Sequence, residues 1–500
     1  MSRGQSVSGI EKSLGELGLT ARGGRDVRVS GLAVDSREAG PGTLFAAMPG
    51  TRIHGAEFAR AALAQGAVAL LTDAEGAEIA AEAVAEHDAA LIVAADPRQA
   101  LAMTAALWFG AQPETMVAVT GTNGKTSVAA FTRMIWQELG VRAINLGTTG
   151  VEGDWHAPLR HTTPEPITLH RALAAAHEAG VECAAMEASS HGLEQRRLDG
   201  VTLTAAAFTN FSQDHLDYHD SFDAYFAAKA GLFARVLPED GTAVINLEDA
   251  RGVDMAAIAH ARGQQLITVG REEGADICLM GQRFEAAGQT VRVRHDAVVR
   301  QVSLPLIGGF QAENVLLAAG LAMACGAEAD EVFAVLPRLS TVRGRMQLAA
   351  TRENGATVFV DYAHTPGAVE TAITALRPHV MGRLVAVIGA GGDRDRTKRP
   401  LMGAAAAANA DLVIVTDDNP RSEDPASIRA AVMEGAPDAI EVGDRAEAIL
   451  RGVDALGPGD ALLICGKGHE TGQVVGDTTY PFDDAEQASV AVSALDGTGA

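Results

Sequence analysis

The sequence predicts an α/β protein that is built from parallel sheets and divided into three domains. Short runs rich in Val, Ile and Leu alternate with Ala-rich stretches, which is typical of buried parallel strands connected by helices. A chain of 500 residues is long enough for about three ordinary domains. The pattern breaks near residues 110–114 and 336–344. We therefore expect a small N-terminal α/β domain at 1–112, a central domain at 113–341 and a C-terminal domain at 342–500.

The expected elements follow in chain order. Ala-rich stretches predict helices at 57–67 and 99–110, and an apolar stripe predicts a third helix at 221–237. Apolar runs predict strands at 68–72, 90–95, 116–120, 181–187, 204–208, 384–389, 412–416 and 461–465.

Composition limits the class of protein. The chain has 40 Lys and Arg residues against 64 Asp and Glu residues, a formal net charge of −24, which repels nucleic acid and anionic membrane surfaces. The cysteines, Cys183, Cys278, Cys325 and Cys465, are scattered, which argues against a disulfide framework and a structural zinc site. The start of the chain has no apolar stretch of the kind that a signal peptide contains, so we expect no signal peptide. No apolar run approaches the ~20 residues of a membrane span. We expect a cytoplasmic monomer that acts on small molecules, without nucleic acid and without membrane insertion.

A phosphate-binding loop follows the strand at 116–120. The segment GTNGKTS leads from this strand into a helical stretch, so backbone N–H groups and the helix N-terminus would cradle phosphate. Lys125 would reach the outer phosphates, and Thr126 would hold Mg²⁺. Val119 stands where the usual motif has its first glycine. The sequence therefore predicts a central P-loop ATPase-like domain that binds ATP through Gly121, Thr122, Asn123, Gly124, Lys125, Thr126 and Ser127.

Polar residues also follow two further strands of the central domain. Glu187 ends one strand, and the loop after the next contains Asp214, His215 and Asp217. Carboxylates at strand ends beside a phosphate loop suit Mg²⁺, which prefers oxygen ligands. Lys229 lies on the apolar stripe of a predicted helix, where its long stem could instead carry the charge to solvent. That stripe consists of Phe222, Tyr225, Phe226, Leu232 and Phe233.

Three segments of the last domain consist of a buried strand followed by a polar loop. They are 384–400, 412–425 and 461–473, and their loops should meet at the carboxyl edge of one Rossmann-like sheet. GAGGDR does not complete a dinucleotide fingerprint, because Arg394 stands at the last glycine position, so we expect no NAD. The loops carry Arg394, Asp418, Asn419, Arg421, Gly466, His469 and Glu470.

The phosphate loop and its surroundings resemble those of the Mur ligases and the related folylpolyglutamate synthetases, ATP-dependent enzymes that join a carboxylate to an amine. The resemblance spans about 35–484. It implies that Lys125, His215 and a carbamylated Lys229 are catalytic, and that Thr126, Glu187, His215 and the carbamate hold magnesium. It further implies ATP contacts by Asn314, Arg345, Asp361 and His364, although Gln347 replaces an expected Glu. Contacts to a UDP-muramoyl-dipeptide are implied for Ser36, Thr162, Thr163, Ser189, Gln195 and Arg197.

The string DNPR at 418–421 resembles the signature of the Mur ligases that add diaminopimelate. The resemblance implies that ATP phosphorylates the D-glutamate carboxylate of the UDP substrate and that the amine of diaminopimelate attacks the acyl phosphate. Arg421 would pair with the distal carboxylate that lysine lacks. A lysine-adding ligase of the same fold is one alternative, and a P-loop ATPase switch that forms no bond is another. The diaminopimelate-binding residues would be Arg394, Asp418, Asn419, Arg421, Gly466 and Glu470.

Overall fold

The structure is a computed structural model that describes residues 10–50, 52–212, 218–285 and 287–497. The chain forms two compact units, each described separately below. The first unit contains the described parts of 1–125, 140–245 and 249–267. The second unit contains the described parts of 126–139, 246–248 and 268–500.

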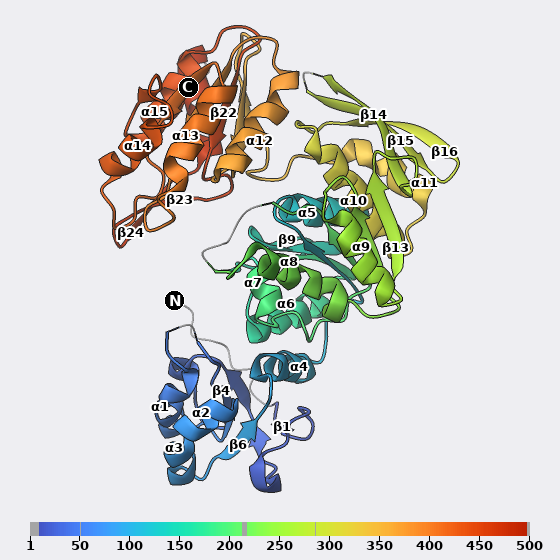
Figure 1. Ribbon diagram of the computed structural model, residues 1–500, viewed down its shortest axis with the longest axis vertical. Coiled ribbons are helices and arrows are strands. Elements are labelled where there is room, and N and C mark those ends of the chain that lie inside the picture. Colours follow the sequence, from blue (N-terminus) through green and yellow to red (C-terminus); the bar gives the residue numbers. More distant parts are fainter. Residues whose placement is uncertain (1–9, 51, 213–217, 286, 498–500) are drawn as a thin grey trace. The chain divides into compact units, whose positions relative to one another are not determined.

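The N-terminal part of the first unit is a parallel sheet with the strand order β3-β4-β5-β6. Helices α1, α2 and α3 lie beside these strands (Figure 1). The helix predicted at 57–67 is shorter, because α1 ends before Gly66, whose φ of 103° leaves the helical region. The strands are β3 (Gly31–Ala33), β4 (Thr43–Ala46), β5 (Ala69–Thr72) and β6 (Ala90–Val93); the helices are α1 (Ala59–Ala64), α2 (Ala74–Ile79), α3 (Ala81–Glu86) and α4 (Pro97–Phe109).

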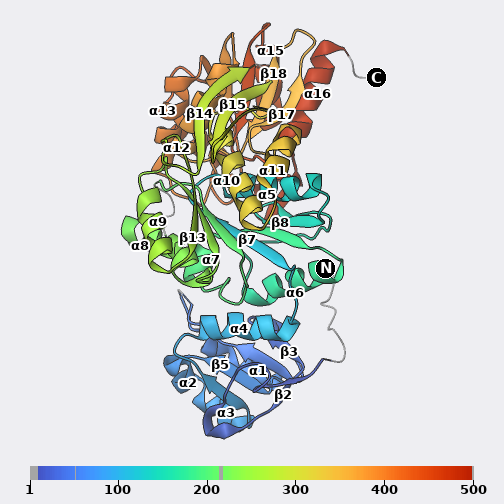
Figure 2. The same cartoon turned by 90° about the vertical axis from the view of Figure 1, so that its right-hand side faces the viewer.

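The second sheet of this unit contains the predicted central strands. Its order is β12-β11-β7-β10-β8-β9, parallel except for the edge strand β9, and Figure 2 shows β7 and β8 within it. Glu187 pairs with Val119 and Phe208 pairs with Thr120, so three strands end level with the phosphate loop. The strands are β7 (Thr115–Thr120), β8 (Ala143–Gly147), β9 (Gly150–Gly153), β10 (Cys183–Glu187), β11 (Ala205–Phe208) and β12 (Thr242–Asn246).

Helices cover this sheet. The helix predicted at 221–237 begins as α8 and continues as a π-helix, Leu232–Val236. The helices beside this sheet are α6 (Pro166–Glu178), α7 (Ser190–Glu194), α8 (Phe222–Gly231) and α9 (Gly252–Ala261).

The second unit begins with most of α5 (Lys125–Glu138), the helix that follows the phosphate loop. It also contains an antiparallel meander of β14, β15 and β16, which the sequence reasoning did not predict. These strands have one half-exposed face and therefore lack the continuous apolar run of a buried parallel strand. Their bounds, with the neighbouring elements, are β13 (Gln265–Gly270), β14 (Ile277–Glu285), β15 (Gly288–His295), β16 (Val298–Leu304), α10 (Phe310–Ala324) and α11 (Ala329–Val335).

The C-terminal sheet has the order β17-β18-β22-β19-β20-β21, and only β17 is antiparallel. The three predicted strands are confirmed as β19, β20 and β22, and Figure 1 shows the hairpin β23–β24 beside this sheet. The strands are β17 (Gln347–Thr351), β18 (Thr357–Asp361), β19 (Leu384–Ile388), β20 (Leu412–Val415), β21 (Ile440–Glu441), β22 (Ala461–Cys465), β23 (Gly472–Val475) and β24 (Thr478–Pro481). The helices are α12 (Pro366–Leu376), α13 (Lys398–Asn409), α14 (Pro425–Met433), α15 (Arg445–Asp454) and α16 (Asp484–Asp496).

The predicted α/β class with parallel sheets is confirmed. Cys183, Cys278 and Cys465 are buried, and Cys325 is half-buried. Among the described residues, no helix is long and apolar enough to cross a membrane.

Candidate active site

The phosphate loop connects β7 to α5. The Lys125 Nζ donates to the carbonyl oxygens of Gly121 at 2.9 Å and Thr122 at 2.8 Å. Gly121 has a φ of 146°, and a Cβ there would lie 1.8 Å from the Thr209 Oγ1, so only glycine fits. The Asn123 N–H donates to the Asn210 Oδ1 at 2.9 Å. The loop is therefore held in shape by the residues that follow β11.

Lys229 is buried against this loop. Its side chain is 1% exposed, and Nζ donates to the Gly121 carbonyl at 2.7 Å. The Nζ also lies 4.5 Å from the ring centroid of Tyr225. The alternative that this lysine reaches solvent is therefore wrong. Phe222, which was predicted to share the buried stripe, is 42% exposed because it stands at the first turn of α8.

Glu187 lies at the end of β10 and is 2% exposed. Its Oε1 accepts from the Thr148 N–H at 2.7 Å, and its Oε2 lies 3.2 Å from the Thr148 hydroxyl, which donates to it. A Cβ at Gly147 would lie 2.0 Å from Oε1, so the carboxylate rests directly on the end of β8. Thr148 was not predicted, although a polar residue directly after a buried strand is the signal that singled out Glu187.

Most of the predicted UDP-substrate residues lie in one hydrogen-bond network with Glu187. The Thr163 hydroxyl donates to the Glu187 carbonyl at 2.9 Å and accepts from the Ser189 N–H at 3.0 Å. The Arg197 guanidinium donates to the Thr163 carbonyl at 2.6 Å and to the Gln195 Oε1 at 2.8 Å. The Thr162 hydroxyl lies 3.0 Å from that of Thr148.

Ser36 belongs to the N-terminal sheet region instead. It begins the short 3-10 helix Ser36–Glu38, and its carbonyl accepts from the Gln65 side chain at 3.0 Å.

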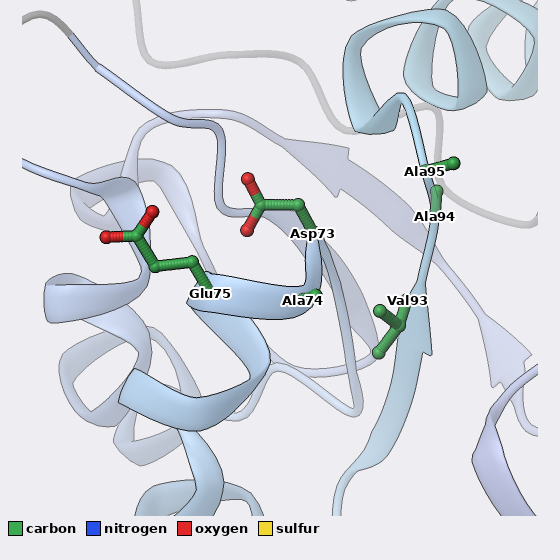
Figure 3. Close-up of a pocket in the computed structure, with 6 residues that line it drawn as sticks. All are labelled: Asp73, Ala74, Glu75, Val93, Ala94 and Ala95. Carbon is green, nitrogen blue, oxygen red and sulfur yellow. The ribbon is translucent and has the colours of Figure 1, made fainter.

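The same region contains a pocket at the carboxyl ends of β5 and β6. Figure 3 shows the side chains that line it, which include two carboxylates. The Asp73 carboxylate caps α2 by accepting from the Gly76 N–H at 2.7 Å. An acidic lining disfavours a phosphate ligand, so we assign this pocket no role. Its lining residues are Asp73, Ala74, Glu75, Val93, Ala94 and Ala95.

The oxygen ligands that magnesium would need are only partly present among the described residues. His215 lies outside them, and within the described parts of the chain His, Cys, Asp and Glu form no cluster of three that could hold a metal. Glu187 supplies a buried carboxylate that suits Mg²⁺. Lys229 as an ammonium is a donor and does not fit a cation, whereas its carbamate would supply oxygens.

The predicted ATP residues of the second unit form a second group. The Arg345 guanidinium donates to the Thr126 hydroxyl at 3.2 Å and lies 4.7 Å from the ring centroid of Tyr362. The Asp361 carboxylate accepts from the Met346 N–H at 2.8 Å. The ring of His364 lies 4.5 Å from that of Tyr362, centroid to centroid.

Asn314 and Gln347, which the sequence also singled out, make other contacts. The Asn314 side chain donates to Gln311 at 3.0 Å within α10. Gln347, the departure from the expected Glu, accepts from the Gly344 N–H at 2.8 Å, so its oxygen shapes the loop before β17.

The loops after β20 and β22 meet, as the topology predicts. The Asn419 Nδ2 donates to the Glu470 Oε2 at 2.8 Å, and the Arg421 Nη1 donates to the Gly392 carbonyl at 2.7 Å. Arg421 has a φ of 51°, and its N–H donates to the Val474 carbonyl at 3.0 Å. Gly466 has a φ of 118°, and a Cβ there would lie 2.6 Å from the Asp418 carboxylate. Arg394 is exposed and donates to the Asp393 carbonyl at 3.0 Å.

Burial and neighbouring charges shift the pKa values of three side chains in these loops. Burial raises the pKa of Glu470, and the nearby Asp418 adds to that shift. Burial also acts to raise the pKa of Asp418, but Arg445 and Lys467 outweigh it and hold that pKa below its usual value. Burial lowers the pKa of His469 to about 4. At neutral pH this site therefore combines a neutral imidazole with a fully charged Asp418.

Sequence models of three Mur ligase domains match the chain in order. They are the Mur ligase family catalytic domain at residues 28–109, the Mur ligase middle domain at 119–322 and the glutamate ligase domain at 344–468. With a phosphate loop on one parallel sheet and polar strand-end loops on another, the chain belongs to the Mur ligase family.

Individual relatives are similar over nearly the whole chain. The UDP-N-acetylmuramoyl-L-alanyl-D-glutamate–2,6-diaminopimelate ligase of Caulobacter vibrioides is 47% identical over 478 residues, covering 94% of this chain and 97% of its own. The enzyme of the same name from Agrobacterium fabrum is 47% identical over 477 residues, covering 94% and 95%. A solved structure with that name is 34% identical, with a TM-score of 0.70, and covers 97% of this chain and 99% of its own.

Proposed function

We propose that this protein is an ATP-dependent ligase that adds diaminopimelate to UDP-N-acetylmuramoyl-L-alanyl-D-glutamate, a step in peptidoglycan precursor synthesis. The observation that carries the proposal is a contact between the DNPR loop and the loop after β22. The Asn419 Nδ2 donates to the Glu470 Oε2 at 2.8 Å. The names of relatives 47% identical over 94% of the chain support it. We further propose that the enzyme acts in the cytoplasm as a monomer.

The first chemical step would be activation of a carboxylate, which is a poor electrophile at neutral pH. The D-glutamate γ-carboxylate would attack the γ-phosphorus of ATP, forming an acyl phosphate and releasing ADP. Lys125 and the N–H groups of residues 121–127 would stabilise the charge on the phosphates. Lys125 is already held at this loop by the Gly121 and Thr122 carbonyls, so it needs little reorganisation.

The second step would form the amide. The amine of diaminopimelate would attack the acyl carbon, the tetrahedral intermediate would expel phosphate, and the amine would lose its proton. Glu470 and Asn419 would hold an ammonium group of the substrate, and Arg421 would pair with the distal carboxylate. Thr162, Thr163, Ser189, Gln195 and Arg197 would orient the UDP substrate around Glu187.

A carbamate on Lys229 is favoured by the local charges. The ammonium groups of Lys125 and Lys229 both donate to the Gly121 carbonyl, so their positive charges repel each other. Reaction of the Lys229 ammonium group with carbon dioxide would form a carbamate anion and release two protons to solvent, which turns repulsion into attraction. Mg²⁺, when bound, would neutralise phosphate charge, and Glu187 with the Lys229 carbamate would supply its oxygen ligands.

A panel of amine substrates tests the proposal directly. ADP release would be measured with ATP, the UDP substrate and either diaminopimelate, L-lysine or no amine. We expect turnover with diaminopimelate and little with lysine. Equal use of lysine would favour the lysine-adding ligase, and equal ADP release without any amine would favour the ATPase switch.

A further inference from the structure

Lys467 is a fully buried cation beside the proposed amino-acid site. It lies two residues after β22, and its side chain is 0% exposed. Its Nζ donates to the Asn419 Oδ1 at 3.0 Å and to the Gly472 carbonyl at 2.9 Å, and forms an ion pair with the Asp418 Oδ1 at 3.3 Å. Two of the ammonium's three N–H donors make these hydrogen bonds, and the Asp418 carboxylate balances its charge. Lys467 is therefore committed to the protein and does not contact a substrate.

The Asn419 side chain is fixed by these contacts. Its Oδ1 accepts from the Lys467 Nζ at 3.0 Å and from the Val474 N–H at 2.9 Å. An ammonium and a backbone N–H can only donate, so the amide oxygen must face them. The Nδ2 is thereby turned toward Glu470, whose Oε2 it reaches at 2.8 Å.

Lys467 also holds Glu470 through the backbone. The Glu470 N–H donates to the Lys467 carbonyl at 2.9 Å, which closes the turn after β22. Lys467 and Arg445 are the buried cations that face Asp418 and Asp484. With those charges balanced, the Glu470 carboxylate adds one negative charge that an incoming ammonium can neutralise.

We propose that Lys467 is a positioning residue for the amino-acid substrate: it orients the Asn419 amide, and through it the Glu470 carboxylate, to receive the substrate's ammonium group. This inference rests on the proposed function. It assigns Lys467 no contact with substrate, ATP or the reacting atoms.

The test is Lys467→Met, which keeps the length of the side chain and removes its charge and donors. With ATP and the UDP substrate saturating, we expect the KM for diaminopimelate to rise roughly 10- to 100-fold, the size expected when a buried polar group loses its partner. The KM values for ATP and the UDP substrate should stay near those of the wild type. An unchanged KM for diaminopimelate would overturn the inference.

A double-mutant cycle separates positioning from general damage. Because Lys467 acts through Asn419, adding Lys467→Met to Asn419→Ala should raise the KM for diaminopimelate no further. Independent, additive increases would contradict the inference. The control is Arg352→Met, which breaks a half-buried ion pair of the same C-terminal sheet region, with Asp496 at 2.7 Å. It should lower thermal stability while leaving the KM for diaminopimelate unchanged.

Lys467→Met leaves Asp418 buried without its partner, and the variant could then fail to fold. In that case the comparison is made between Asp418→Asn and the double variant Asp418→Asn/Lys467→Met, which lacks the uncompensated charge. The double variant should still show the higher KM. If the wild type uses diaminopimelate and neither comparison shifts the KM for diaminopimelate, the inference about Lys467 is wrong and the proposed function still stands. If the wild type shows no diaminopimelate-dependent ADP release, the proposed function fails with it.

Discussion

Lys125 and Lys229 share one acceptor, the Gly121 carbonyl, and we expect opposite roles for these two residues of the same type. Lys125 would supply a positive charge to the outer phosphates of ATP. Lys125→Ala should therefore lower kcat by about 10³-fold, because one preorganised charge is lost from the transition state. Product formation under saturating substrates is the measurement, and circular dichroism checks the fold. Near-normal turnover by a folded variant would contradict the assignment of the phosphate loop.

Lys229 is expected to act as a carbamate. Lys229→Ala should lose most activity, and acetate should restore part of it by supplying carboxylate oxygens in the space that the side chain leaves. The measurement is ADP release against acetate concentration, with chloride at equal ionic strength as the control. Electron density for an unmodified ammonium in the active enzyme would refute the carbamate.

Arg421 is expected to set the choice between diaminopimelate and lysine. Lysine would leave the guanidinium fork without its carboxylate partner, which costs about 2–4 kcal/mol, or roughly 30- to 1000-fold in kcat/KM. Arg421→Ala should therefore narrow the ratio of kcat/KM between the two amines. The exposed Arg394 provides the comparison, and Arg394→Ala should change the ratio less. An unchanged ratio in Arg421→Ala would show that specificity resides elsewhere.

At the scale of elements, α6 carries a buried histidine that links stability to pH. His170 is 2% exposed, and its Nε2 has no hydrogen-bond partner among the described residues. A Cβ on Gly200 would lie 2.7 Å from that atom. Burial lowers the pKa of His170 to about 4. Because folding favours the neutral ring, stability is full above the unfolded pKa of about 6.5 and falls as the pH drops toward 4.

The expected result is a loss of about 1.4 kcal/mol of unfolding free energy from this residue between pH 7.5 and 5.5. Urea unfolding at the two pH values measures it, and His170→Met should show a smaller loss than the wild type. The exposed His260 offers a matched control, since His260→Met should keep the wild-type loss. Equal losses in wild type and His170→Met would contradict the prediction.

The elements also show where periodicity is informative. The parallel strands β7, β10, β19, β20 and β22 were predicted within one or two residues, because strands covered on both faces are continuous apolar runs. The meander β14–β16 and the hairpin β23–β24 were not predicted. Each has exposed residues along it, so no apolar run marks it. The hairpin matters to the site, because the Val474 N–H donates to Asn419 at 2.9 Å.

At the scale of the whole molecule, a ligase differs from an ATPase switch in the coupling of its reactions. The acyl phosphate forms only on the UDP substrate, and it turns over only when the amine is present. ADP release should therefore fall to a small fraction of its full rate when either substrate is omitted, as followed by a coupled pyruvate kinase assay. Sustained release with ATP alone would contradict the ligase. A net charge of −24 does not attract anionic substrates, so we expect local donors such as Lys125 and Arg197 to hold them.

The sequence by itself determined the α/β class, the phosphate loop and the strand-end loops that carry Glu187 and Asn419. These features depend on local order along the chain, because a strand's apolar run and the loop that follows it are contiguous. Only the tertiary structure decided that Lys229 is buried, that Thr148 donates to Glu187 and that Lys467 donates to the Asn419 side chain. Each of these three contacts joins residues that are distant in the chain. Periodicity shows which face of an element a side chain occupies, but it does not show which atoms cover that face.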